Sequence, residues 1–136
     1  MRRRRFFQSL FGGMGAALIA PHARAAQSRS ILLQESPLAG FQYYRGAAVW
    51  PFLRVGERLT LVRESFNGHD GDAVAVYFRN DKLGFVPSRE NSTIAQLLDR
   101  GERLEAKIAR LLEESNPWRR VRIAIFIPFT PTMARW

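Results

Sequence analysis

Large apolar residues recur at every second position along several short segments of this chain, mostly with smaller or polar residues between them. Residues 73–78 read Ala-Val-Ala-Val-Tyr-Phe, and residues 121–127 read Val-Arg-Ile-Ala-Ile-Phe-Ile. Successive side chains of a strand point to opposite faces, so this period predicts strands with one face more apolar than the other. Weaker versions of the pattern predict further strands over residues 31–33, 59–64, 82–86 and 104–108.

One segment has the apolar spacing of a helix. The apolar residues of segment 94–98 recur on one helical face, Asn91 or Ser92 can cap its start, and Gly101 can end it. The elements together predict a mainly β fold: a small antiparallel OB-like or SH3-like β-barrel of roughly five to seven strands, with one α-helix between strands.

Two stretches lack a clear period. Residues 41–45 are expected to be extended, and residues 46–55 to form a loop whose aromatic side chains pack on the domain. If residues 41–45 are extended, the adjacent rings of Tyr43 and Tyr44 face opposite sides, and at least one of them is expected in the core.

The first 25 residues follow a different pattern. Four arginines, Arg2 to Arg5, precede a weakly apolar run that ends in Ala23-Arg24-Ala25. This is the three-part layout of a secretory signal, and Arg-Arg-Arg-Phe-Phe-Gln resembles the twin-arginine export pattern. We expect residues 1–25 to be a signal peptide, cleaved after Ala25, that sends the protein to the periplasm. The alternative is a basic tail that binds nucleic acid or membrane in the cytoplasm.

The rest of the chain is expected to be one domain. Residues 26–30 form a flexible start, residues 31–128 the β-barrel, and residues 129–136 a C-terminal tail. The 136 residues carry a net charge of +9, but five of the 21 basic residues precede Ala26, so the remainder has 16 basic against 12 acidic residues, or +4. This mild excess alone proves no nucleic-acid partner.

The chain has no cysteine and two histidines. Disulfides, thiolate metal sites and a catalytic thiol are therefore excluded, and we expect neither a metal nor a cofactor. The most distinctive segment is the polar turn before strand 73–78, Glu-Ser-Phe-Asn-Gly-His-Asp-Gly-Asp. Asn67, Gly68 and Asp72 are expected to shape this turn.

Four segments, in this order, resemble the HIRAN domain. They are Gly40-Phe41-Gln42-Tyr43-Tyr44, residues 59–64, residues 67–76, and Lys82-Leu83-Gly84-Phe85-Val86-Pro87, within a match over about residues 30–112. The resemblance implies a modified OB-like barrel that binds single-stranded DNA, in the best-understood members at a free 3′ end. It implies no catalysis, since ATP hydrolysis in the large helicases that carry this domain belongs to separate domains. This chain also has no GxxxxGK[ST] phosphate loop.

The resemblance also implies site residues. Tyr43 and Tyr44 would belong to the DNA pocket, and Asp70 would accept a hydrogen bond from the 3′-hydroxyl while repelling a phosphate. The turn offers Asp70 a second role, because its carboxylate can accept backbone N–H groups. His69 stands where some members have an aromatic residue, so it either stacks on the terminal base or is an exposed turn residue.

Gln42 departs from the pattern of those relatives that carry a basic residue beside the tyrosine pair. Its amide can hydrogen-bond to a phosphate but supplies no charge, which predicts weaker and less salt-dependent binding. Arg45, Arg63 and Arg79 are candidates to replace the missing cation.

The last strand offers another nucleic-acid candidate. Arg122 and Phe126 share a face with Arg120, and interleaved cations and aromatic rings suit a single strand. The alternative is a solvated edge strand that arginines protect from pairing.

The elements and the resemblance together predict a non-enzymatic module that binds single-stranded DNA in an OB-like groove, with no integral membrane contact once the signal is removed. The resemblance implies that the bound part of the DNA is its 3′ end. The alternative is an exported periplasmic β-domain that binds a peptide, glycan or small molecule in the same pocket.

Overall fold

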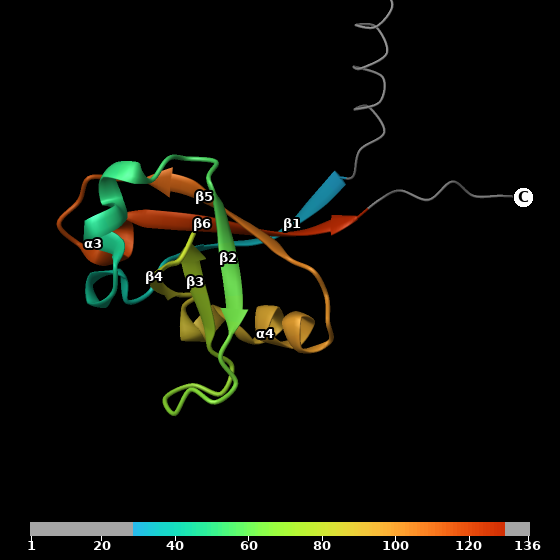
Figure 1. Cartoon of the computed structure of the whole chain (residues 1–136). Coiled ribbons are helices and arrows are strands. Elements are labelled where there is room, and N and C mark those ends of the chain that lie inside the picture. Colours follow the sequence, from blue (N-terminus) through green and yellow to red (C-terminus); the bar gives the residue numbers. More distant parts are fainter. Residues whose placement is uncertain (1–28, 130–136) are drawn as a thin grey trace, which may run out of the picture. The chain divides into compact units, whose positions relative to one another are not determined.

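A computed structural model describes residues 29–129 of the chain (Figure 1). Within this range, Ser30–Pro128 form one compact unit. The predicted signal peptide, residues 26–28 and residues 130–136 lie outside the described residues.

Six strands form one sheet in the order β1-β6-β5-β2-β3-β4. Their bounds are β1 (Arg29–Pro37), β2 (Arg58–Arg63), β3 (Val74–Phe78), β4 (Asp81–Phe85), β5 (Glu105–Leu111) and β6 (Val121–Phe129). The pairs β2–β3, β2–β5, β3–β4 and β5–β6 are antiparallel. The predicted mainly β, antiparallel fold is confirmed, because the period-two segments are the ones that pair.

The sheet is not closed by a full ladder of hydrogen bonds. A bridge joins the chain after β1 to β4, where Ala39 and Phe85 each donate a backbone N–H to the other's carbonyl at 2.9 Å. Gly84 allows this close approach, since its φ is +155° and a Cβ there would lie 2.2 Å from the Ala39 carbonyl oxygen. The bridge holds two otherwise distant segments side by side.

The predicted helix is α4 (Ser92–Asp99), which buries Ile94 and Ala95. Figure 1 shows α4 beside the lower ends of β2 and β3, with the short helix α3 (Gly46–Val49) toward the other end of the sheet. Four 3₁₀ turns complete the described elements: η1 (Phe41–Tyr43), η2 (Trp50–Phe52), η3 (Ser88–Glu90) and η4 (Pro117–Arg119). None of the described helices is both long and apolar enough to cross a membrane.

The expected extended segment 41–45 is wrong, and so is the expected loop over most of residues 46–55. Of the aromatic side chains expected to pack on the domain, Trp50 does pack against the core, whereas Phe52 is exposed. Residues 41–52 form η1, α3 and η2 instead. Phe41 explains the difference, because it is only 2% exposed and its ring meets Trp50 edge-on at 6.1 Å. Gly46 leaves room for that ring, since a Cβ there would lie 2.3 Å from Phe41 Cε1. Burying one aromatic anchor curls the chain into short helical turns, which a period-two pattern does not reveal.

The core lies between the sheet and these short helices. Its fully buried apolar side chains come from β3, β4, β5, β6, α4, η1 and the chain after β1; they include Leu38, Phe41, Val74, Val76, Leu83, Ile94, Ile108, Ile123 and Ile125. Burying a side chain of this size stabilises a fold by about 1.5–3 kcal/mol. This core fixes the segments that carry the candidate site.

Candidate functional site

A pocket of about 250 Å³ opens where three segments meet: the chain after β1, the loop of residues 64–73 between β2 and β3, and the end of β4. The pocket brings together Tyr44, His69 and Asp70, three of the residues singled out in the sequence. Its full lining is Ala39, Tyr44, Asn67, His69, Asp70, Ala73, Phe85, Val86 and Ser88.

The turn on one side of the pocket is shaped by two side chains. Asn67 Oδ1 accepts hydrogen bonds from the backbone N–H groups of His69 at 2.8 Å and Asp70 at 3.2 Å. Asp70 Oδ1 in turn accepts the N–H of Asp72 at 2.9 Å. Gly68 has no atom within 4 Å of a Cβ built on it and no positive φ. The turn therefore depends on side-chain acceptors and on the backbone N–H of Asp72.

A buried amide holds the second oxygen of Asp70. Asn91 is 2% exposed, and its Nδ2 donates to Asp70 Oδ2 at 2.7 Å. Asn91 does stand at the N-cap position of α4, but its side chain makes no capping hydrogen bond. The predicted capping role of this side chain is thus wrong, since an Asn before a helix normally signals a cap and the sequence does not show Asp70 beside it.

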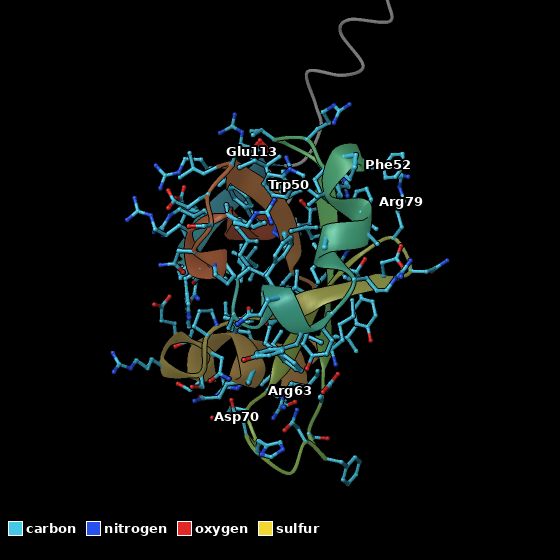
Figure 2. All side chains as sticks on the ribbon, turned by 90° about the vertical axis from the view of Figure 1, so that its left-hand side faces the viewer. Trp50, Phe52, Arg63, Asp70, Arg79 and Glu113 are labelled. Carbon is cyan, nitrogen blue, oxygen red and sulfur yellow. The ribbon has the colours of Figure 1, made fainter. Side chains whose placement is uncertain are left out.

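The Asp70 carboxylate has no cationic partner in the described part of the chain. No ion pair involves this carboxylate within residues 29–129. Arg63 lies at the same end of the domain (Figure 2), but its guanidinium donates to Asp99 at 3.1 Å and to the Ala73 carbonyl at 3.2 Å. A carboxylate has about four acceptor positions, so two protein donors leave room for a ligand hydroxyl.

Tyr44 and Phe85 form an aromatic wall, with ring centroids 5.8 Å apart in an edge-on arrangement. Lys82 Nζ lies 5.0 Å from the Tyr44 ring centroid and 4.4 Å from that of Phe85. The same ammonium donates to Glu64 Oε2 at 2.8 Å. The cation next to the pocket is therefore already neutralised.

The pKa values of this ion pair agree with its geometry. The hydrogen bond from Lys82 holds the pKa of the Glu64 carboxyl below its ordinary value of 4.5, against the opposing effect of burial. Burial lowers the pKa of Lys82, but the hydrogen bond and the attraction of Glu64 outweigh burial and raise the pKa above its ordinary value of 10.5. Both groups are charged at neutral pH.

Gln42 and Tyr43, the two other site candidates from residues 40–44, lie outside the pocket lining. Tyr43 is 76% exposed and Tyr44 40%, so the expectation that one of them is in the core is wrong, because η1 replaces the extended segment on which it depended. Gln42 lies on η1 and is exposed. Ser88 and Phe85 line the pocket but were not identified from the sequence, which gives no sign that the end of β4 faces Asp70.

The other candidate cations are engaged elsewhere. Arg45 Nε lies 3.3 Å from Asp81 Oδ1. The guanidinium of Arg79 lies 4.6 Å from the Phe78 ring centroid, and Figure 2 shows Arg79 far up the domain from Asp70. Neither arginine lines the pocket.

The three residues that were expected to form one nucleic-acid-binding face on the last strand have different surroundings. Arg120 precedes β6, and its guanidinium lies 4.0 Å from the Trp50 ring centroid. Arg122 lines a different hollow, and the Phe126 ring has Lys107 Nζ 5.7 Å from its centroid. These residues do not line the pocket of Tyr44 and Asp70.

The fold and the pocket define a small β-domain with an aromatic wall facing a fixed carboxylate, an arrangement of the kind found in binding modules. A model of the HIRAN domain matches residues 31–130. The chain belongs to the HIRAN domain family, and thus to a family of OB-like, nucleic-acid-binding domains that are not themselves catalytic.

Two crystal structures are similar to this domain. A protein from Lactobacillus plantarum has a TM-score of 0.65 and 26% identity, over 75% of this chain and 98% of its own. The HIRAN domain of human HLTF has a TM-score of 0.57 and 18% identity, over 73% of this chain and 78% of its own, and its likeness shows the fold. No curated protein matches the sequence.

Proposed function

We propose that this domain binds the free 3′ end of single-stranded DNA, with the terminal nucleotide in the pocket between Tyr44 and Asp70. The proposal rests on one observation: hydrogen bonds fix the Asp70 carboxylate, and it has no cationic partner in the described part of the chain. Asn91 and the Asp72 N–H hold its carboxylate in place, while no ion pair within residues 29–129 neutralises it.

A fixed, unpaired carboxylate selects between strand ends by charge. It accepts a hydrogen bond from a neutral 3′-hydroxyl, and a hydrogen bond to a charged group contributes about 1.5–3 kcal/mol. It repels a 3′-phosphate, because like charges placed together across an interface oppose binding. The pocket would thus favour a terminal hydroxyl over a phosphorylated end.

The aromatic residues supply affinity that does not depend on sequence. Tyr44 and His69 both line the pocket that would receive the terminal nucleotide. Tyr43, outside the pocket and 76% exposed, is available to stack on a neighbouring base. Each base–aromatic stack contributes roughly 1–3 kcal/mol. Gln42, on the same short helix, would add an uncharged hydrogen bond to the backbone.

The same lining supports a second candidate. A pocket with apolar walls, one hydroxyl acceptor and no free cation also suits a neutral ligand with hydroxyl groups, such as a glycan. If the leader exports the protein, it would meet such ligands in the periplasm. Any DNA that it meets there would have to be imported or extracellular.

Fluorescence anisotropy with labelled single-stranded oligonucleotides separates these candidates. At low salt we expect 3′-hydroxyl ends to bind at least about tenfold more tightly than 3′-phosphate ends, a difference of about 1.4 kcal/mol. Asp70→Asn should reduce this ratio, mainly by improving binding of the phosphorylated end. Asp81→Asn is the matched control, since it removes the same charge from a residue that lies outside the pocket lining.

Absence of binding to both oligonucleotides at low salt would overturn the DNA proposal. Glycan and peptide panels would then test the second candidate.

A further inference from the structure

Two arginines stand directly opposite each other on neighbouring strands. In the β5–β6 ladder Arg110 is the register partner of Arg122, and the register shifts by a bulge between Ile108 and Arg110. Like charges in directly opposed positions destabilise a sheet. Bulges re-aim side chains and often lie next to functional sites. The pairing is unfavourable unless negative charge offsets it, and among the described residues Glu35 pairs with Arg122 but no carboxylate pairs with Arg110.

These arginines border a hollow of about 340 Å³, separate from the first pocket. A third arginine, Arg119 on η4, completes its basic lining; the other lining residues are Pro37, Leu112, Trp118 and Val121. Three guanidinium groups around one hollow form a site for a group with several negatively charged oxygens, because guanidinium matches phosphate in a bidentate geometry.

The acidic residues nearby leave this hollow positive. Glu35 Oε1 lies 3.2 Å from Arg122 Nε, and Glu114 Oε2 lies 3.7 Å from Arg119 Nε. Both pairs are substantially exposed, and exposed pairs are weak. Arg110 has no ion pair in the described part of the chain. Two carboxylates against three arginines leave one positive charge in excess.

The hollow lies next to the first pocket. Leu38 is 1% exposed and points into the core, so its neighbours Pro37 and Ala39 point the other way along this extended segment. Pro37 lines the arginine hollow and Ala39 the first pocket. Two residues of extended chain span about 7 Å. η4, which carries Arg119, also packs near η1, which carries Tyr43. A strand whose end occupies the first pocket has a short path to the arginines.

We propose that Arg110, Arg119 and Arg122 bind backbone phosphates of the strand upstream of the end held by Asp70. The proposal rests on the proposed function and extends it from one nucleotide to a longer stretch. It also accounts for the cation missing at Gln42. Arg63 is held by Asp99 and the Ala73 carbonyl, and neither Arg45 nor Arg79 lines the first pocket, so the positive charge comes from the arginine hollow instead.

Oligonucleotides of two lengths test the site. Wild-type protein should bind a 3′-hydroxyl 12-mer more tightly than a 3-mer, and with a steeper dependence on salt. Arg110→Gln with Arg119→Gln should weaken 12-mer binding by about tenfold and lower its salt slope by roughly 0.7 for each phosphate that the variant no longer neutralises. The weakening should be much smaller for the 3-mer. The control double variant is Arg58→Gln with Arg103→Gln, which removes two arginines from a hollow between β2 and β5.

The outcomes separate this proposal from the previous one. If neither oligonucleotide binds wild-type protein, the proposed function itself fails. If the 3-mer binds but the Arg110/Arg119 variant keeps the wild-type salt slope, only the phosphate site is wrong. If the Arg58/Arg103 control weakened 12-mer binding equally, the phosphate site would also be overturned, because the loss of affinity would then reflect the total charge of the protein.

Discussion

Asp70 has the turn-shaping role that the sequence left as one of two alternatives, and its place in the pocket lining is compatible with the other. Its Oδ1 accepts the Asp72 N–H and stabilises the turn, while Oδ2 is held by the buried amide of Asn91 and the residue lines the pocket. A carboxylate with both oxygens anchored is pre-organised for a ligand. Anchoring of this kind favours binding, because little side-chain freedom remains to be lost.

Asn91→Ala tests this anchoring at the level of one residue. The variant removes the donor to Asp70 Oδ2, so we expect the free energy of unfolding to fall by about 1–3 kcal/mol. We also expect the preference for 3′-hydroxyl over 3′-phosphate ends to decrease, as Asp70 gains freedom to turn away. Urea unfolding and anisotropy measure the two effects. Asn80→Ala, in the exposed β3–β4 turn, is the control; lower stability with an unchanged end preference would make Asn91 purely structural.

At the scale of elements, the sheet places the pocket walls. β4 carries Phe85, and the bridge from Phe85 to Ala39 holds the chain after β1 against it. The β2–β3 loop then closes the third side with Asp70. None of these elements contains the site by itself.

Gly84→Ala tests the bridge. A Cβ at this position would lie 2.2 Å from the Ala39 carbonyl oxygen, on a backbone with φ of +155°. We expect the free energy of unfolding to fall by about 1–3 kcal/mol, as is typical of overpacking. The backbone amides of Ala39 and Phe85 should also exchange their hydrogens faster. Gly71→Ala should be nearly neutral, because nothing lies within 4 Å of a Cβ there. Unchanged exchange in Gly84→Ala would show that the bridge does not depend on this glycine.

The elements differ in how well sequence alone predicts them. Period-two segments such as 74–78 and 121–127 became strands, and the capped apolar segment 94–98 became α4. Residues 41–52 had no clear period, and they form short helical turns because Phe41 packs on Trp50 and fits only beside Gly46. This contact between single side chains is not recorded in a periodic pattern.

At the scale of the whole molecule, the basic residues are unevenly distributed along the chain, and this bears on where the protein is located. Five of the 21 basic residues lie in the first 25 positions, together with the twin-arginine-like pattern. We propose that this segment directs export, which would place the nucleic-acid site outside the cytoplasm.

A reporter fusion tests export. Residues 1–30 fused to a folded reporter should carry it to the periplasm, as measured by cell fractionation. Replacing Arg3, Arg4 and Arg5 by lysine preserves the charge but removes the arginine pattern, so we expect export to stop. Arg24→Lys is the matched control and should leave export intact. Retention of the unaltered fusion in the cytoplasm would overturn the proposal.

The sequence by itself determined the strands, the main helix and the membership of the HIRAN family, because each of them depends on patterns of residues that are close together in the sequence. Only the tertiary structure decided that Tyr44, Asp70 and Phe85 share a pocket, and that Asn91 holds Asp70. It also decided that Arg110 faces Arg122, since a bulge sets that register. A periodic pattern says which side of a segment faces the core. Which distant segments meet there depends on strand register, close glycine contacts and the packing of single anchors such as Phe41.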